Sequence, residues 1–192
     1  MPVPAPEALA FLLARRSRPA RTLTAPGPDR AELTRLLTAA TRVPDHGKLE
    51  PWRFHVLTGA AGPRLAALTR RLGAEAGRDP EAIEKAAAPF ETSPVTVAVI
   101  AAPQPSEKIP EHEQTLSAGA ACLQLLNAAL AAGWGACWLS GWMATDRAWL
   151  AEGLGLSAPD WVAGFLHLGT ETQAPPDRPR PDLARVVTWT GT

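Results

Sequence analysis

The stretch from Val95 to Ala101 constrains the fold more than any other part of this 192-residue chain. Every residue in it is apolar except Thr96, and most are β-branched. A short run of this kind is typical of a central strand that is covered on both faces, because a solvated face would show alternating polar residues. The rest of the chain must therefore supply helices for both sides of a sheet.

Apolar residues at helical spacing, with Gly and Pro as breakers, predict those helices over residues 7–16, 29–42, 64–76, 80–88, 111–132 and 145–152. Asp29 and Glu32 have the spacing of a capping box at the start of the second helix. Further strands are predicted over residues 52–57, 134–139, 161–168 and 185–190. This order of elements indicates an α+β fold in a single domain over residues 1–192, with a mixed central β-sheet flanked by helices.

Residues 170–192 are predicted to leave that domain as an extended C-terminal arm. Four prolines in this segment oppose regular structure, namely Pro175, Pro176, Pro179 and Pro181. We expect an arm so rich in proline to pack on another subunit.

The charge balance argues against large anionic partners. The chain has 19 Lys and Arg against 19 Asp and Glu, so it has no global field that would attract nucleic acid or an anionic membrane. The most apolar long run, residues 116–132, is interrupted by Gln124 and Asn127 and reads as a buried helix, not a membrane span. No signal-peptide pattern is present at the N-terminus, and the two cysteines form no disulfide or metal pattern. We therefore expect a cytoplasmic protein.

A stiff polar loop separates the second predicted helix from the first strand. Between Thr41 and Leu57 the chain carries two prolines, a glycine, His46 and several charged residues. Each proline fixes its own φ and pushes the preceding residue toward an extended conformation. Held loops of this kind often carry binding groups.

Several common chemistries are excluded or disfavoured by spacing. No G-x-G-x-x-G follows a strand and no P-loop is present, so neither motif explains the arginines near the N-terminus. The four histidines have no metal-ligand spacing, and Ser140 lacks the preceding glycine of a nucleophile elbow. We therefore nominate no metal ligand and no catalytic side chain. Taken alone, Arg15 to Arg18 could equally be a solvated cationic helix end.

Four segments in order resemble the nitroreductase superfamily, and most of all its short bacterial NAD(P)H-dependent members. They are Arg15-Arg16-Ser17, the run from Arg42 to Phe54, Ser117-Ala118-Gly119 on the long helix, and Gly133 to Gly141. The resemblance implies the nitroreductase-like fold, an intertwined homodimer, FMN bound tightly at its interface, and NADH or NADPH as hydride donor. The acceptor would be a small electron-poor molecule such as a nitroaromatic or a quinone, reduced by ping-pong hydride transfer through flavin N5.

The resemblance also implies site residues. Arg15, Arg16 and Ser17 would hold the FMN phosphate and ribityl chain, which suits the two parallel hydrogen bonds that a guanidinium gives to a phosphate. Arg42 and His46 would reach the flavin, with Arg42 favouring the negative charge of the reduced ring. The remaining implied contacts are Trp138, Leu139, Ser140 and Gly141 along the ring edge and, for NAD(P)H, Ala128, Ala129, Leu130, Ala131, Ala132 and Gly133.

Two positions depart from the family pattern. Related short members often have an arginine where this chain has Leu139, so a cationic contact to the cofactor is missing or comes from elsewhere, with Arg53 and Lys48 as candidates. Glu50 replaces a common glutamine, and an acid near a reduced flavin is unfavourable unless it is paired or points away. These departures leave two alternatives open: a flavin-binding or storage protein with little turnover, and another flavin reaction on the same fold, such as reductive dehalogenation or flavin destruction.

Overall fold

The computed structural model describes residues 3–191, and its centre is the strand that the sequence predicts most strongly. Strand β3 spans Val95–Ala101, and all seven of its residues are buried. It lies between β2 (Trp52–Thr58) and β5 (Trp161–Glu171). On the far edge of β5 lies β4 (Gly135–Leu139), and the two-residue strand β1 (Leu23–Thr24) pairs with the end of β5.

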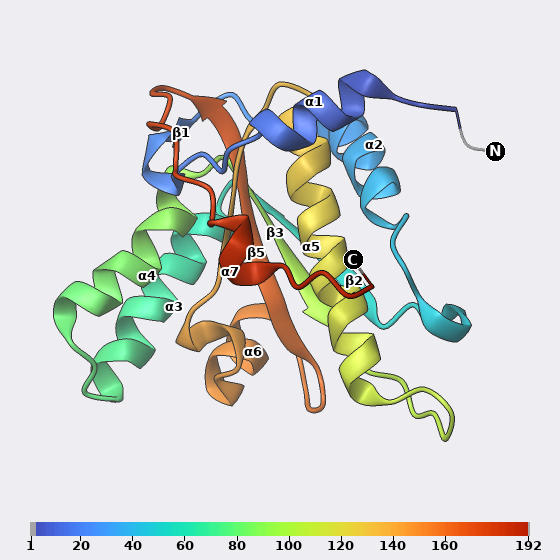
Figure 1. Ribbon diagram of the computed structural model, residues 1–192. Helices are drawn as coiled ribbons and strands as arrows, with labels where there is room; N and C mark the ends of the chain where they lie inside the picture. Colours follow the sequence, from blue (N-terminus) through green and yellow to red (C-terminus); the bar gives the residue numbers. More distant parts are fainter. Residues whose placement is uncertain (1–2, 192) are drawn as a thin grey trace.

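Helices cover both faces of this sheet (Figure 1). On one face, α2 (Arg30–Ala40) and α5 (Glu111–Ala131) pack on Val95, Val97 and Val99. On the other face, α3 (Ala61–Glu75), α4 (Pro80–Thr92) and α6 (Arg147–Leu154) pack on Ala98 and Ile100. The alternation of side chains along a strand thus divides the core into two apolar clusters, one on each face.

The local signal for the start of α2 is confirmed. Asp29 and Glu32 form the predicted capping box, with both hydrogen bonds at 2.8 Å. In α2 the side chains of Leu33, Leu36 and Ala40 are buried, as the helical spacing predicts.

The prediction of a mixed sheet is wrong in one respect, because every strand pair in the described residues is antiparallel. Two helices, α3 and α4, join β2 to β3, and this pair of helices returns the chain in the opposite direction. The single helix α5 does make β3 and β4 parallel to each other, but β5 lies between them and pairs antiparallel with both.

Several element boundaries also differ from the prediction. Helix α3 begins at Ala61, and its Gly62 is essential to the packing, since a Cβ there would lie 2.2 Å from the carbonyl oxygen of Phe90. Helix α4 continues through Pro89 to Thr92. Helix α6 passes Gly153 and ends at Leu154, and its C-cap is Gly155, whose φ of 69° lies in the left-handed region that favours glycine.

The ends of the chain form separate short elements. Helix α1 (Pro6–Ala14) has no buried residue. The predicted last strand over residues 185–190 is absent from the described residues; Asp182 instead caps a short helix, α7 (Leu183–Val186), by accepting a hydrogen bond from the Ala184 N–H. No helix among residues 3–191 is long and apolar enough to cross a membrane.

Candidate functional site

The segment Arg15–Ser17 leaves α1 and runs beside the start of β4. Just after it, the Arg18 backbone N–H donates a 2.8 Å hydrogen bond to the Ala136 carbonyl oxygen. Arg15 donates from Nη2 to Ser17 Oγ at 3.2 Å, which positions the serine beside the arginines. Arg18 also forms an ion pair with Glu171 at the end of β5, at 3.3 Å. The segment is therefore anchored to two strands of the sheet.

Three arginines meet at this segment, and none of them forms an ion pair within residues 3–191. Burial, followed by the charges of Arg16 and Arg180, lowers the pKa of the Arg15 guanidinium. The Nε atoms of Arg15 and Arg16 are buried and have no hydrogen-bond partner within the described chain. Arg180 comes from the C-terminal arm and donates a hydrogen bond to the Leu13 carbonyl oxygen. Bringing these cations together costs desolvation free energy, and some of their N–H donors have no partner. Such a cluster fits an anionic ligand such as a phosphate.

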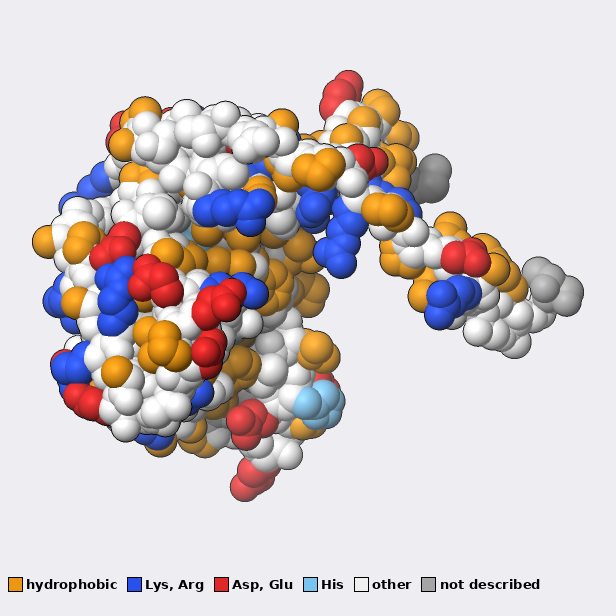
Figure 2. Space-filling view, turned by 90° about the vertical axis from the view of Figure 1, so that its left-hand side faces the viewer, with side chains coloured by type: hydrophobic (Ala, Val, Ile, Leu, Met, Phe, Trp, Pro, Cys, Tyr) orange, Lys and Arg blue, Asp and Glu red, His pale blue; other side chains and the backbone are white. Residues whose placement is uncertain are grey.

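The predicted ring-edge residues lie beside this cluster, in a pocket of about 610 Å³. Its volume is within the range of small-molecule sites. Figure 2 looks onto the α3 and α4 face and shows an apolar hollow next to Lys and Arg side chains. The pocket is lined by Pro19, Ala20 and Arg21, by one stripe of α4, and by Cys137, Leu139, Ser140, Gly141 and Trp142.

Trp138 does not line this pocket. Successive strand residues point to opposite faces, so Cys137 and Leu139 face the pocket while Trp138 faces the other side of the sheet. There its indole Nε1 donates to the Ala163 carbonyl oxygen at 3.3 Å and covers Gly164, where a Cβ would lie 2.1 Å from that nitrogen.

Arg42 and His46 lie at the other end of the sheet. Trp52, which follows their loop, pairs with Ala101 and through it with Trp161 at the start of β5, whereas β4 begins opposite Gly169. Eight residues of strand at about 3.3 Å each correspond to roughly 26 Å along β5. A single chain therefore does not bring these two residues to the arginine cluster.

The loop that carries His46 is held in a strained conformation. The Asp45 carboxylate accepts hydrogen bonds from the backbone N–H groups of Leu49 and Glu50, at 3.2 and 2.9 Å. Gly47, Lys48 and Glu50 all have positive φ, at 71°, 56° and 48°, which is costly for the two residues with side chains.

Contacts with α5 fix this loop in place. His46 Nδ1 lies 2.8 Å from Glu113 Oε2 near the start of α5. The Ser117 hydroxyl donates to the Pro44 carbonyl oxygen at 2.7 Å and accepts from Trp52 Nε1 at 3.1 Å. The loop is therefore positioned by the helix, and its exposed groups, Arg42 and His46 among them, face outward from the chain.

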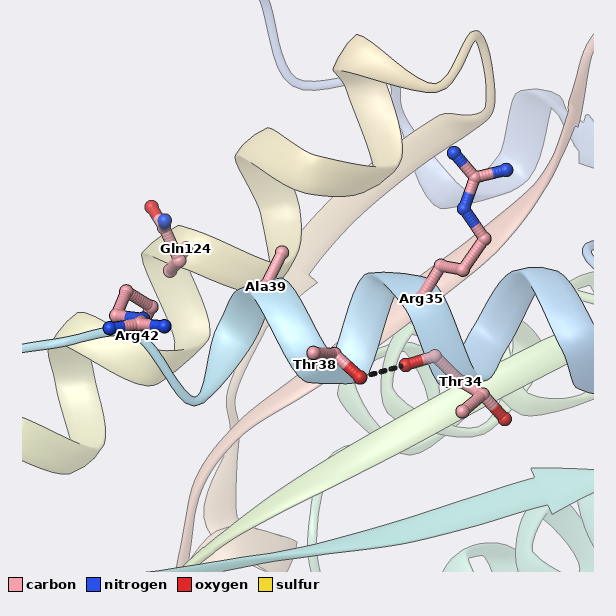
Figure 3. A pocket seen from close by; sticks show the side chains of 6 residues that line it. All are labelled: Thr34, Arg35, Thr38, Ala39, Arg42 and Gln124. Carbon is pink, nitrogen blue, oxygen red and sulfur yellow. Dashed lines mark hydrogen bonds between the residues drawn. The ribbon is translucent and has the colours of Figure 1, made fainter.

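Arg42 borders a groove between α2 and α5 of about 550 Å³ (Figure 3). Arg35 lies on the same groove, as do Thr34, Thr38, Ala39 and Gln124. Of the run predicted to contact NAD(P)H, Ala128 and Ala132 line an adjoining groove of about 350 Å³ that also includes Arg35 and Trp134. Ala129 is instead buried in the core between α5 and the sheet.

The two candidates for a missing cation, Arg53 and Lys48, do not line the 610 Å³ pocket. Arg53 forms an ion pair with Asp160, and Lys48 is exposed on the loop beside His46. Glu50 is exposed on that same loop. The cations that do line the pocket, Arg21 and Lys85, were not singled out from sequence.

Nothing in the described residues points to metal or thiolate chemistry. No group of three or more His, Cys, Asp or Glu side chains among residues 3–191 is placed to hold a metal ion. Burial raises the pKa of the Cys122 thiol to about 12 and also raises the pKa of Cys137, so neither thiol is activated.

The model of the Nitroreductase family matches residues 12–170. An Escherichia coli (strain K12) protein named "Putative NAD(P)H nitroreductase YdjA" is 38% identical over 165 residues, which cover 85% of this chain and 88% of that protein.

Solved structures share the fold. A nitroreductase-like family protein from Bacillus cereus has a TM-score of 0.80 and 22% identity, with 100% of both chains covered. A protein from Desulfovibrio desulfuricans, described as "a putative nitroreductase in complex with FMN", has a TM-score of 0.74 and 23% identity, with 99% of both chains covered.

Proposed function

The chain belongs to the nitroreductase family of oxidoreductases, and we propose that it is an FMN-dependent NAD(P)H oxidoreductase acting on nitroaromatic, quinone or similar electron-poor acceptors. When bound, FMN would supply the redox chemistry by accepting a hydride from NAD(P)H and passing two electrons to the acceptor. For a nitro compound the net reaction converts one NAD(P)H, one proton and the nitro group into NAD(P)⁺, a nitroso group and water. The protein's part is to bind and orient these molecules.

The arginine cluster is the observation that carries this proposal. We assign the FMN phosphate to Arg15, Arg16 and Arg180, because their charges converge and two buried Nε–H donors are left unused. Arg180 is an addition to the residues proposed from sequence. The Ser17 hydroxyl, held by Arg15, is placed to contact the ribityl chain.

The flavin ring would then enter the neighbouring 610 Å³ pocket, along Leu139, Ser140 and Gly141. Trp138 would act from the other face of the sheet by fixing the backbone of β4 against β5. The apolar lining excludes water from the ring, and strong positive potential at one end of the pocket would orient the phosphate.

A homodimer accounts for the distance between the two halves of the predicted site. Arg42 and His46 lie some 26 Å along the sheet from the arginine cluster of the same chain, so a second copy would have to bring them to the flavin. Large apolar side chains are exposed on α1, on α5 and on the arm, namely Leu9, Leu12, Leu13, Leu116, Leu123, Leu183, Val186 and Trp189. Figure 2 shows the arm projecting from the body of the molecule. Such surfaces are typical of an interface.

We place the NAD(P)H contacts of the predicted run at Ala128 and Ala132, which line the groove between α2 and α5 together with Arg35. A guanidinium at this point suits a dinucleotide phosphate. Leu130, Ala131 and Gly133 complete the segment, and Ala129 supports it from the core.

The decisive experiment is an absorption spectrum of the purified protein before and after anaerobic addition of NADH or NADPH. We expect flavin bands that bleach on addition and return when a nitroaromatic or quinone is supplied. A colourless protein that cannot be reconstituted with FMN would refute the proposal. A flavin that bleaches too slowly for turnover would instead support a storage role.

His46→Ala tests the two-subunit site. Because the His46 side chain is exposed, its removal is expected to weaken FMN retention without affecting the fold. Lys108→Ala, a substitution at another exposed residue that belongs to no proposed FMN contact, is the control. Measurement of mass by light scattering should show a dimer in all three proteins. A monomer that retains FMN would contradict the shared site.

A further inference from the structure

Helix α4 presents one lysine to the 610 Å³ pocket. The side chains of α4 that line it follow helical spacing and form a single stripe, Ala82, Lys85, Ala86, Pro89 and Thr92. Lys85 also borders a smaller adjoining space of about 30 Å³, together with Leu139 and Ser140. The lysine therefore lies across the pocket from the predicted ring-edge residues.

The positive charge of Lys85 has no compensation within residues 3–191. Neither Lys85 nor Arg21, the other cation of the lining, forms an ion pair there, and the lining has no acidic side chain. Two acids of α4 are engaged elsewhere, because Glu84 and Glu91 both bind Arg70 at 2.7 Å. Glu81, one turn before Lys85, makes no ion pair in the described chain.

An uncompensated cation beside an apolar pocket favours ligands that carry or gain negative charge there, because the apolar walls strengthen the field. The FMN phosphate is already provided for by the arginine cluster. The other charge that a bound flavin acquires is on its pyrimidine ring, when two electrons and one proton are added. Groups near that edge of the ring set how much tighter the reduced form binds than the oxidised form.

We propose that Lys85 is the cation that faces the reduced flavin ring in this protein, with Arg21 as a second, weaker contributor. This inference rests on the proposed FMN site and adds to it. It places in α4 the charge that Leu139 does not supply, while Arg53 is paired with Asp160 and Lys48 lies on the distant loop. Arg42 would then contact the flavin of the second copy without being its main counter-charge.

The test compares Lys85→Gln and Lys85→Arg with the wild-type protein, with Lys108→Gln as the matched control because Lys108 is also an exposed lysine and belongs to no proposed flavin contact. Each protein is saturated with FMN, and its two-electron midpoint potential is measured by anaerobic spectroelectrochemistry. For Lys85→Gln we expect reduced FMN to lose about tenfold in affinity relative to oxidised FMN, which corresponds to a potential lower by about 30 mV. Lys85→Arg should retain most of the wild-type potential, and Lys108→Gln should match it.

An unchanged potential in Lys85→Gln with FMN bound overturns this inference and leaves the proposed function intact. An equal fall in Lys108→Gln overturns it as well, since the effect would then be one of net charge. If the wild-type protein binds no FMN, the proposed function itself is refuted. Failure of the Lys85 inference and failure of the proposed function are therefore distinguishable.

Discussion

Buried His167 is expected to make the stability of this protein fall as the pH drops below neutrality. The side chain lies on β5, is 1% exposed and packs against Phe90 with ring centroids 5.5 Å apart. Its Nδ1 lies 3.0 Å from the Thr96 hydroxyl, which satisfies one ring nitrogen of the neutral form. Burial disfavours the charged form and lowers the pKa of His167 to about 3.

The sign follows from the two states. A histidine in the unfolded chain has a pKa of about 6.5, so between about pH 6.5 and pH 3 the unfolded state binds a proton that the folded state does not. Stability is therefore fully present above about pH 6.5 and is lost as the pH falls, by about 1.4 kcal/mol per unit well below that value. At pH 5 the loss due to His167 amounts to about 2 kcal/mol.

Urea unfolding followed by circular dichroism at pH 7.5 and pH 5.0 measures this difference, in a range where most carboxylates stay ionised. His167→Gln should reduce the difference between the two pH values by about 2 kcal/mol, whatever it does to stability at either one. His55→Gln is the control, because His55 is exposed on β2 and should leave the difference unchanged. If His167→Gln retains the full wild-type difference, the assignment to this buried ring is wrong.

Three further predictions follow from single contacts. Thr69→Val should lower the free energy of unfolding by about 1–3 kcal/mol, because it leaves the fully buried Trp149 Nε1–H without its 2.9 Å acceptor. In urea titrations the double variant with Trp149→Phe should lose less free energy of unfolding than the sum of the two single losses. Arg180→Gln should weaken FMN binding at least about tenfold through loss of a charge-assisted contact, as measured by fluorescence quenching, whereas Arg178→Gln on the same arm should not. Glu50→Gly should raise the unfolding free energy by up to about 1 kcal/mol, because its φ of 48° strains a residue with a side chain; a lower value would show that Glu50 makes a stabilising contact.

The elements with strong local signals were predictable. Strand β3, the capping box of α2 and the long helix α5 each depend on patterns within a few turns of chain, and all are confirmed. The strand directions were not predictable in this way, because they depend on β5 entering between β3 and β4. The last element was also misread, since Asp182 caps a helical turn where β-branched residues suggested a strand.

The candidate site shows the same division. The resemblance placed Arg15, Arg16 and Ser17 together with the residues from Leu139 to Gly141. In the fold both segments adjoin β4, the first near its start and the second at and beyond its end. Arg180 and Lys85 lie in segments with no distinctive motif, one in the arm and one on α4. Sequence reasoning could not find them, because their importance comes only from what lies beside them.

The sequence by itself determined the two-sided core, the capped start of α2 and the chemical types of the site, because apolar spacing, caps and motifs act over short distances along the chain. The tertiary structure decided where charge is left uncompensated. Only the tertiary fold brings Arg180 of the arm to Arg15 and brings Lys85 of α4 to the pocket beside Leu139 and Ser140. The same fold leaves Arg42 and His46 at the far end of the sheet from the Arg15 segment. Electrostatic interactions depend on distance in space and on burial, and neither quantity is readable from separation along the sequence.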